Sequence, residues 1–175
     1  MTPNMTLTGA DGLLLRPWAE QDAPAVLAAA ESVDTLAVAD RAQAEQWLAA
    51  QRQAWERGDR FAFAVLVGDE VLGLSVLKRP DPAAPAAEVG YWTTGAARGR
   101  GLAPRALAVL TDWAFAEFPL EQLELFHRLD NAASCRVAQK TGYGLAAVVP
   151  PKPPHPTEAH LHLRERGAGG RSPGN

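Results

Sequence analysis

Arg98-Gly99-Arg100-Gly101-Leu102-Ala103 is the stretch that decides how this chain folds. Glycines let the backbone turn tightly and bring its N–H groups close to an anion. The first turn of a following helix adds unpaired N–H donors and the positive end of its dipole, and the two arginines add charge-assisted hydrogen bonds. The stretch therefore predicts a phosphate-binding loop. The alternative is a helix start whose arginines are merely solvated.

The residues on either side of the loop have the expected patterns. The preceding segment 87–92 is rich in β-branched and aromatic residues and predicts a strand. Apolar residues recur at helical spacing after the loop, at Ala103, Leu107, Leu110, Ala114 and Phe118. The loop lacks the Lys-Ser/Thr ending of a Walker A motif and the full G-x-G-x-x-G of a dinucleotide fold, so nucleotide hydrolysis and nicotinamide binding are disfavoured.

The remaining elements follow from turn and cap signals. We expect strands at 13–16, 61–67, 71–77, 123–128, 143–149 and 158–163, helices at 22–32, 40–58 and from 131, and irregular proline-rich segments at 79–85 and 150–156. Asp22 and Asp40 are the expected N-caps of the first two helices. The order β-α-α-β-β-β-α-β-α-β-β predicts an α/β fold with a mixed sheet and helices on both faces. One domain is expected over 1–166, followed by a disordered Gly/Ser/Pro tail over 167–175.

Composition excludes several classes of protein. The 175 residues are 47% hydrophobic, which suits one domain with a real core. The formal net charge of -3 and the lack of aromatics among lysines argue against nucleic-acid binding. A single cysteine, Cys135, excludes an internal disulfide framework. No apolar run resembles a signal peptide or membrane span, so a cytoplasmic protein is expected.

Three segments resemble the GCN5-related N-acetyltransferases (GNAT). Arg98-x-x-Gly101-x-Ala103 is similar to the superfamily's R/Q-x-x-G-x-G/A pyrophosphate loop. The segment 131–143 resembles the N-x-x-S-x-x-V-A-x-K-x-G-F/Y block of the branch that acetylates ribosomal-protein N-termini, and 13–18 resembles that branch's first strand. The resemblance implies a central, mostly antiparallel sheet and acetyl-CoA as co-substrate, with no metal.

The resemblance also implies which residues contact the cofactor. Pantetheine would lie along the strand residues Val89, Gly90, Tyr91, Trp92 and Thr93, whose backbone amides can also supply an oxyanion donor. The pyrophosphate would lie on residues 98–103. Asn131 would bond the pantetheine and Ser134 would lie near the sulfur; the alternative is that both are helix caps only.

Acetyl transfer to an amine requires removal of a proton from the acceptor ammonium. Glu88 is the candidate general base, and its alternative role is a solvated carboxylate near the strand end. Many family members carry a tyrosine four residues after the serine, where it reprotonates the leaving thiolate, but this chain has Ala138. Ser134 is the candidate donor in its place.

Other reactive residues have simpler interpretations. Cys135 is favoured as a small buried hydrophobe over a covalent nucleophile, and His127 as a structural histidine over a proton relay. His160 and His162 share a strand face near His155, but without a matching cysteine or carboxylate set they are interpreted as incidental rather than as zinc ligands.

Three tryptophans leave alternatives open. Trp47 and Trp55 belong to the core or to the acceptor wall. Trp92 covers the pantetheine arm or packs in the sheet.

The function predicted is an acetyl-CoA-dependent N-acetyltransferase that works by direct attack in a ternary complex. Its acceptor is a primary amine, on a small molecule or at a protein or peptide N-terminus. Transfer of another acyl group, such as succinyl or propionyl, and a non-catalytic acyl-CoA sensor are the alternatives. No nucleic-acid or membrane partner is expected, and a homodimer is left open.

Overall fold

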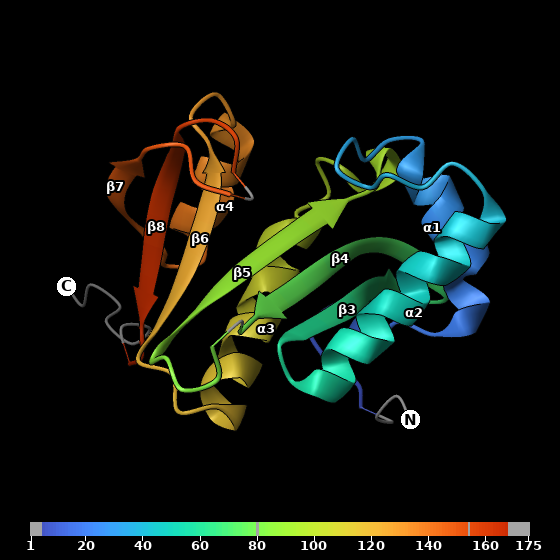
Figure 1. Cartoon of the computed structure of the whole chain (residues 1–175), viewed down its shortest axis with the longest axis horizontal. Coiled ribbons are helices and arrows are strands. Elements are labelled where there is room, and N and C mark those ends of the chain that lie inside the picture. Colours follow the sequence, from blue (N-terminus) through green and yellow to red (C-terminus); the bar gives the residue numbers. More distant parts are fainter. Residues whose placement is uncertain (1–4, 80, 154, 168–175) are drawn as a thin grey trace.

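An eight-stranded sheet forms the centre of the computed structural model, which describes residues 5–79, 81–153 and 155–167 (Figure 1). The strands are β1 (Leu7–Thr8), β2 (Leu13–Pro17), β3 (Arg60–Val67), β4 (Glu70–Lys78), β5 (Ala86–Thr93), β6 (Gln122–Arg128), β7 (Gly144–Val149) and β8 (Ala159–Glu165). Their order in the sheet is β1-β2-β3-β4-β5-β6-β8-β7. All pairs between them are antiparallel except β5 with β6.

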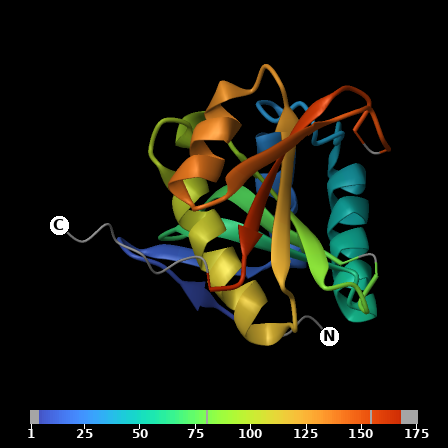
Figure 2. The same ribbon diagram turned by 90° about the vertical axis from the view of Figure 1, so that its left-hand side faces the viewer.

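Helices cover both faces of the sheet, as predicted (Figures 1 and 2). The α-helices are α1 (Ala23–Ala30), α2 (Arg41–Arg57), α3 (Leu102–Glu117) and α4 (Ala132–Lys140), and short 3-10 turns lie at η1 (Glu20–Asp22) and η2 (Gly95–Ala97). One core cluster joins α3 to the sheet through Leu107, Leu110 and Phe63. A second joins α1 and α2 to the other face through Val26, Leu48 and Ala64. The predicted α/β class is therefore confirmed, and so is the element order from β2 onward.

The parallel pair β5–β6 positions the site. Its register covers only Ala86–Val89 opposite Gln122–Leu125. Beyond that point β5 stays on β4 while β6 continues on β8, and the two strands separate (Figure 1). Within the described part of the chain, one edge of β5 therefore has no strand partner from Gly90 onward, so its backbone N–H and C=O groups can bind a ligand.

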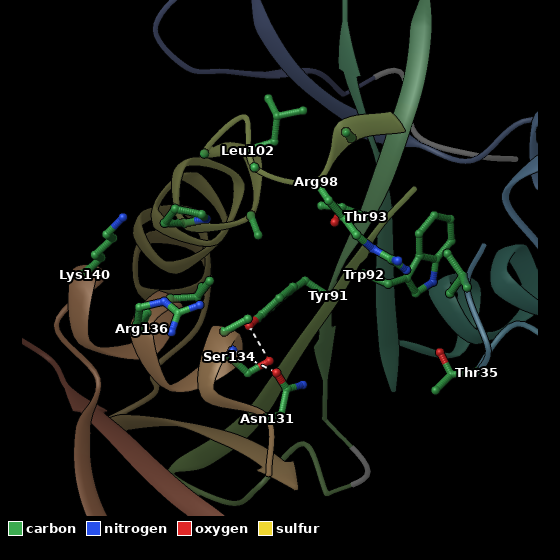
Figure 3. Close-up of a pocket in the computed structure, with 18 of the residues that line it drawn as sticks. Thr35, Tyr91, Trp92, Thr93, Arg98, Leu102, Asn131, Ser134, Arg136 and Lys140 are labelled. Carbon is green, nitrogen blue, oxygen red and sulfur yellow. Dashed lines mark hydrogen bonds between the residues drawn. The ribbon is translucent and has the colours of Figure 1, made fainter. Parts of the chain in front are cut away.

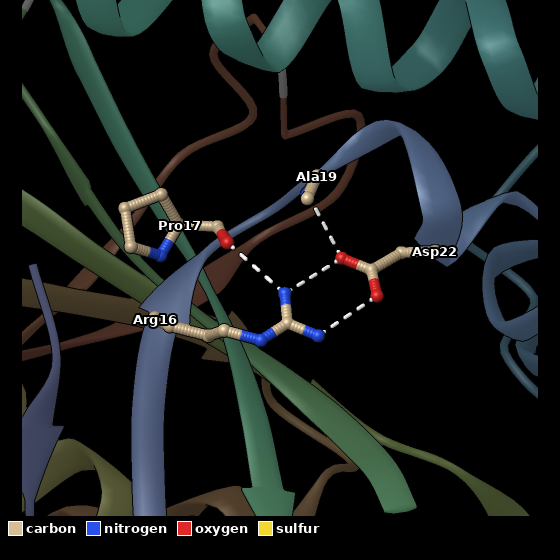
Figure 4. Close-up of polar contacts among 4 residues, drawn as sticks. All are labelled: Arg16, Pro17, Ala19 and Asp22. Carbon is tan, nitrogen blue, oxygen red and sulfur yellow. Dashed lines mark hydrogen bonds and ion pairs between the residues drawn. The ribbon is translucent and has the colours of Figure 1, made fainter. Parts of the chain in front are cut away.

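Of the two predicted helix N-caps, Asp40 is confirmed, and Asp22 makes a different contact from the one predicted. Asp40 accepts the N–H of Gln43 and begins α2, as predicted. Asp22 makes no side-chain cap bond; its buried carboxylate instead accepts two bonds from the Arg16 guanidinium, at 2.8 and 2.9 Å, and one from the Ala19 N–H (Figure 4). The hydrogen bond to Asp22 raises the pKa of Arg16 despite desolvation. This contact ties the end of β2 to the start of α1, which a local pattern does not reveal.

Smaller differences concern the ends of the chain. The strand β1 was not expected, and it pairs with β2 through Leu7 and Leu15. The proline-rich segment after β7 contains an isolated bridge between Lys152 and His155. The predicted tail lies outside the described residues except for Gly167. No helix among the described residues is long and apolar enough to span a membrane.

Candidate active site

The predicted phosphate loop lies at the mouth of a pocket of about 590 Å³ (Figure 3). The pocket is bounded by β5, the loop, the start of α3 and one face of α4. Most of the predicted cofactor residues line it: Tyr91, Trp92, Thr93, Arg98, Gly99, Gly101, Leu102, Ala103, Asn131 and Ser134. Segments far apart in the sequence are thereby brought together.

The loop backbone is shaped for an anion. Gly99 and Gly101 have φ of 76° and 70°, in the left-handed region that favours glycine, and Gly101 is the N-cap of α3. Among the described residues, the N–H groups of Gly99, Gly101, Leu102 and Ala103 donate to no protein acceptor. These donors and the helix dipole suit a phosphate.

Positive charge surrounds the pocket. Arg98, Arg136 and Lys140 line it, and Asp34 is the only carboxylate among the lining residues. Arg136 and Lys140 were missed in the sequence analysis, although they share a helical face with Ala133. The Arg98 guanidinium also donates to the Ser32 carbonyl at 2.5 Å, which anchors the segment after α1 beside the loop.

A hydrogen-bonded pair of hydroxyls lies on the opposite wall. Tyr91 donates to Ser134 Oγ at 2.9 Å, a contact between β5 and α4 (Figure 3). Burial raises the pKa of Tyr91, partly offset by that hydrogen bond. Asn131 Oδ1 accepts the Ser134 N–H at 3.1 Å. Asn131 is therefore an N-cap that also lines the pocket.

A known protein family matches most of this sequence. Residues 12–144 match the family described as Acetyltransferase (GNAT) domain. The chain belongs to the GNAT acetyltransferase family.

Proteins similar to this GNAT chain include ribosomal-protein acetyltransferases. It is 30% identical over 88 residues to the ribosomal-protein-serine acetyltransferase of Escherichia coli (strain K12), covering 50% of this chain and 49% of that protein. The match therefore spans about half the length of that relative. A structure described as a putative ribosomal-protein-serine acetyltransferase from Vibrio cholerae aligns with a TM-score of 0.82 at 21% identity, over 94% of this chain and 99% of the other. Mycobacterium smegmatis RimJ in complex with CoA-disulfide aligns with a TM-score of 0.81 at 20% identity, over 96% and 89%.

Four predicted residues of the GNAT site do not line this pocket. Val89 is 1% exposed in the core, Gly90 packs beside β4, and Arg100 is exposed on the loop. Glu88 lies on a second cavity of about 490 Å³, and its carboxylate accepts a bond from Lys78 Nζ at 2.8 Å. That cavity is also lined by Asp59, Arg60, Ala86, Ala87 and Glu124.

Ala138, where many GNAT members have tyrosine, lies on the inner face of α4 and is fully buried. A tyrosine at this position would have to displace core side chains. His127, the candidate proton relay, is buried and lies outside the pocket lining.

Trp92 lines the pocket and also packs against Trp18, with ring centroids 6.0 Å apart. Its role in covering the pantetheine arm stays a prediction. Trp47 packs edge-on against Trp18 at 5.1 Å. Trp55 packs against Phe61 and Phe63. Both helix tryptophans are half-buried and pack against the core clusters.

Proposed function

We propose that this GNAT protein is an acetyl-CoA-dependent N-acetyltransferase that transfers acetyl to a primary amine by direct attack in a ternary complex. One observation carries the proposal: a single pocket combines an anion-binding loop, an unpaired strand edge and a hydroxyl donor. The loop would bind the phosphates, the strand edge would bind the pantetheine arm, and the hydroxyl would protonate the leaving thiolate.

The phosphates of CoA would be held by the four free N–H groups of the loop, with Arg98, Arg136 and Lys140 supplying charge. The donors are those of Gly99, Gly101, Leu102 and Ala103. The pantetheine arm would run along the unpaired edge of β5 from Gly90 to Thr93. Strand-like hydrogen bonding to an extended ligand uses the same backbone groups that pair strands.

Ser134 would donate the proton to the leaving thiolate. Its oxygen already accepts the Tyr91 hydrogen, so its own hydrogen is free to point toward the pocket. Because burial raises the pKa of Tyr91, the phenol stays protonated at neutral pH and can resupply Ser134. Tyr91 on β5 thus provides a phenol that this chain lacks at Ala138.

Glu88 would accept the proton of the acceptor ammonium through water. It lies on the wall of the second cavity, one residue before Val89, which is the last residue of β5 that pairs with β6. Its ion pair with Lys78 holds the carboxylate in place. The name of the Escherichia coli relative favours a protein as the acceptor, and a similar structure described as a ribosomal L7/L12 alpha-N-protein acetyltransferase favours the N-terminal amine.

The test is turnover by the purified chain with acetyl-CoA and an amine panel of N-terminal serine peptides, polyamines and amino acids, followed by mass spectrometry. We expect the mass of one acetyl group on a peptide N-terminus. The matched control is the same peptide with its amino group already blocked, which must not react. CoA binding by calorimetry without transfer to any amine would instead identify a sensor. Faster transfer from succinyl-CoA or propionyl-CoA would replace the acetyl assignment.

A further inference from the structure

Four metal-binding side chains meet outside the CoA pocket. They are His127 on β6, Cys135 on α4, and His160 and His162 on β8, and their ligand atoms all lie within 4.8 Å of one another. His127 and His162 are buried, and the other two are half-buried. None of the four lines the pocket beneath the phosphate loop.

The topology of the sheet creates this cluster. Strand β8 lies between β6 and β7, with His127 directly opposite His160 in register. His160 and His162 are two residues apart and so project from the same face of β8. Helix α4 packs on β6 and β7 beside β8 (Figure 2). The Cys135 side chain lies with the three histidines on that face. The cysteine that a zinc interpretation lacked in the sequence is therefore supplied by the fold.

Two of these histidines, His127 and His162, use their Nδ1 atoms for hydrogen bonds to backbone carbonyls and turn their Nε2 atoms toward each other. His127 Nδ1 lies 2.7 Å from the Arg128 carbonyl oxygen, and His162 Nδ1 lies 3.1 Å from the Tyr143 carbonyl oxygen. Carbonyl oxygens only accept, so each Nδ1 atom carries a hydrogen, and in a neutral ring the Nε2 atom then carries none. Yet the two Nε2 atoms face each other at 2.9 Å.

Two bare nitrogens at that distance repel each other unless something positive lies between them. A second proton would leave a charged imidazolium buried with no carboxylate in the cluster. A metal ion satisfies both lone pairs at once. Metal-ligating histidines commonly donate their other N–H to a backbone carbonyl, as both rings do here.

We propose that His127, His160, His162 and Cys135 bind one divalent transition-metal ion, with zinc the preferred ion. In a tetrahedral site with Zn–N of 2.0–2.1 Å and Zn–S of 2.3 Å, neighbouring nitrogens are about 3.4 Å apart and the sulfur is about 3.6 Å from each nitrogen. The observed spacing needs only small side-chain shifts to reach these values. His160 Nδ1 is buried and has no hydrogen-bond partner among the described residues, so the ion would satisfy this nitrogen as well.

The donor set selects the class of metal. Imidazole and thiolate suit zinc, cobalt and nickel, whereas calcium and magnesium require oxygen ligands. Binding releases the Cys135 thiol proton to solvent, since the thiolate is the ligand. Four protein ligands close the coordination shell, so the proposed ion is structural and fastens α4 to β6 and β8.

The experiment uses the full chain purified without a polyhistidine tag. Metal content is measured by inductively coupled plasma mass spectrometry, and the apo protein is then titrated with Co²⁺. We expect one equivalent of metal, with visible d–d bands and a thiolate-to-cobalt charge-transfer band in the near ultraviolet. Zn²⁺ should displace the cobalt spectrum and raise the unfolding temperature of the apo protein.

Variants locate the site. Cys135→Ser, a conservative change at a half-buried position, should abolish the charge-transfer band, and His162→Gln should lower the bound metal at least tenfold. His155→Gln is the matched control, because His155 lies outside the cluster, and it should keep the full spectrum. Failure of the folded wild-type chain to bind Co²⁺ or Zn²⁺ would overturn the proposal and leave a proton shared by His127 and His162. An unchanged spectrum in folded Cys135→Ser would overturn it as well.

Discussion

Replacing Gly101 by valine tests the phosphate-loop assignment, because the structure separates its effect on the protein from its effect on a ligand. A Cβ at Gly101 meets no heavy atom within 4 Å, so the free protein has room for a side chain. The cost to folding is the left-handed backbone, with φ of 70°, or about 1–2 kcal/mol. A chain with a core of this size should remain folded.

The cost to CoA binding should be larger. A side chain at the N-cap of α3 stands where a phosphate must approach the free N–H groups of Leu102 and Ala103. Loss of one charge-assisted hydrogen bond weakens binding by about 1.5–3 kcal/mol, which is about 10- to 150-fold in the dissociation constant. Calorimetry with CoA measures this value directly.

The hairpin turn between β3 and β4 offers a matched control. Gly68 has φ of 62°, is exposed, and likewise has nothing within 4 Å of its Cβ position. Gly68→Val should therefore lower the unfolding temperature by a similar amount as Gly101→Val and leave CoA affinity unchanged. A folded Gly101→Val protein that binds CoA within twofold of the wild type would refute the assignment.

Three further predictions concern charge and protonation. Arg136→Ala or Lys140→Ala should each weaken CoA binding about fivefold at low salt and less at high salt, because both side chains are exposed. Pantetheine binding should not change, since both groups would contact only the phosphates. Equal weakening of pantetheine binding would contradict this role. Glu88→Gln should lower kcat by about 10²–10⁴ near neutral pH without changing CoA affinity, with a loss that shrinks as pH rises; wild-type kcat at saturating amine would exclude the base. Burial raises the pKa of Tyr143 to about 12, so its contribution to stability is present below pH 10 and is lost as pH rises toward 12, by roughly 3 kcal/mol in all. Chemical denaturation should show this fall of the unfolding free energy with pH in the wild type, and a smaller fall in Tyr143→Phe. At pH 7, Thr111→Val should cost more stability than Tyr143→Phe, because it leaves the buried phenol without its partner at 2.7 Å.

Local signals in the sequence were enough to predict the order of elements from β2 onward and the glycine turn that begins α3. Gly58, with φ of 79°, ends α2 where predicted, and Asp40 begins it. Such features depend on residues within a few positions of each other. Asp22 shows the limit, because its partner Arg16 is a strand residue six positions away and the contact depends on how β2 meets α1.

Contacts between distant segments could not be predicted in the same way. Tyr91 and Ser134 were both selected as cofactor residues, but nothing in the sequence indicates that their hydroxyls are 2.9 Å apart. The cluster around His127 depends on the strand order β6-β8-β7. With β7 beside β6 instead, His160 would not lie opposite His127, and Cys135 would have no partners.

Helix α4 links the two sites, because Ser134 lines the CoA pocket and the adjacent Cys135 joins the histidine cluster. The helix has nine residues, too few to be stable alone, and Ala138 is its only buried residue. Its position therefore depends on contacts at specific points: the Asn131 cap, the Tyr91 hydroxyl on one side and the histidines of β6 and β8 on the other. If the proposed metal site is occupied, we expect the ion to limit how far Cys135 and the adjacent Ser134 can move, and so to help keep the Ser134 hydroxyl beside Tyr91.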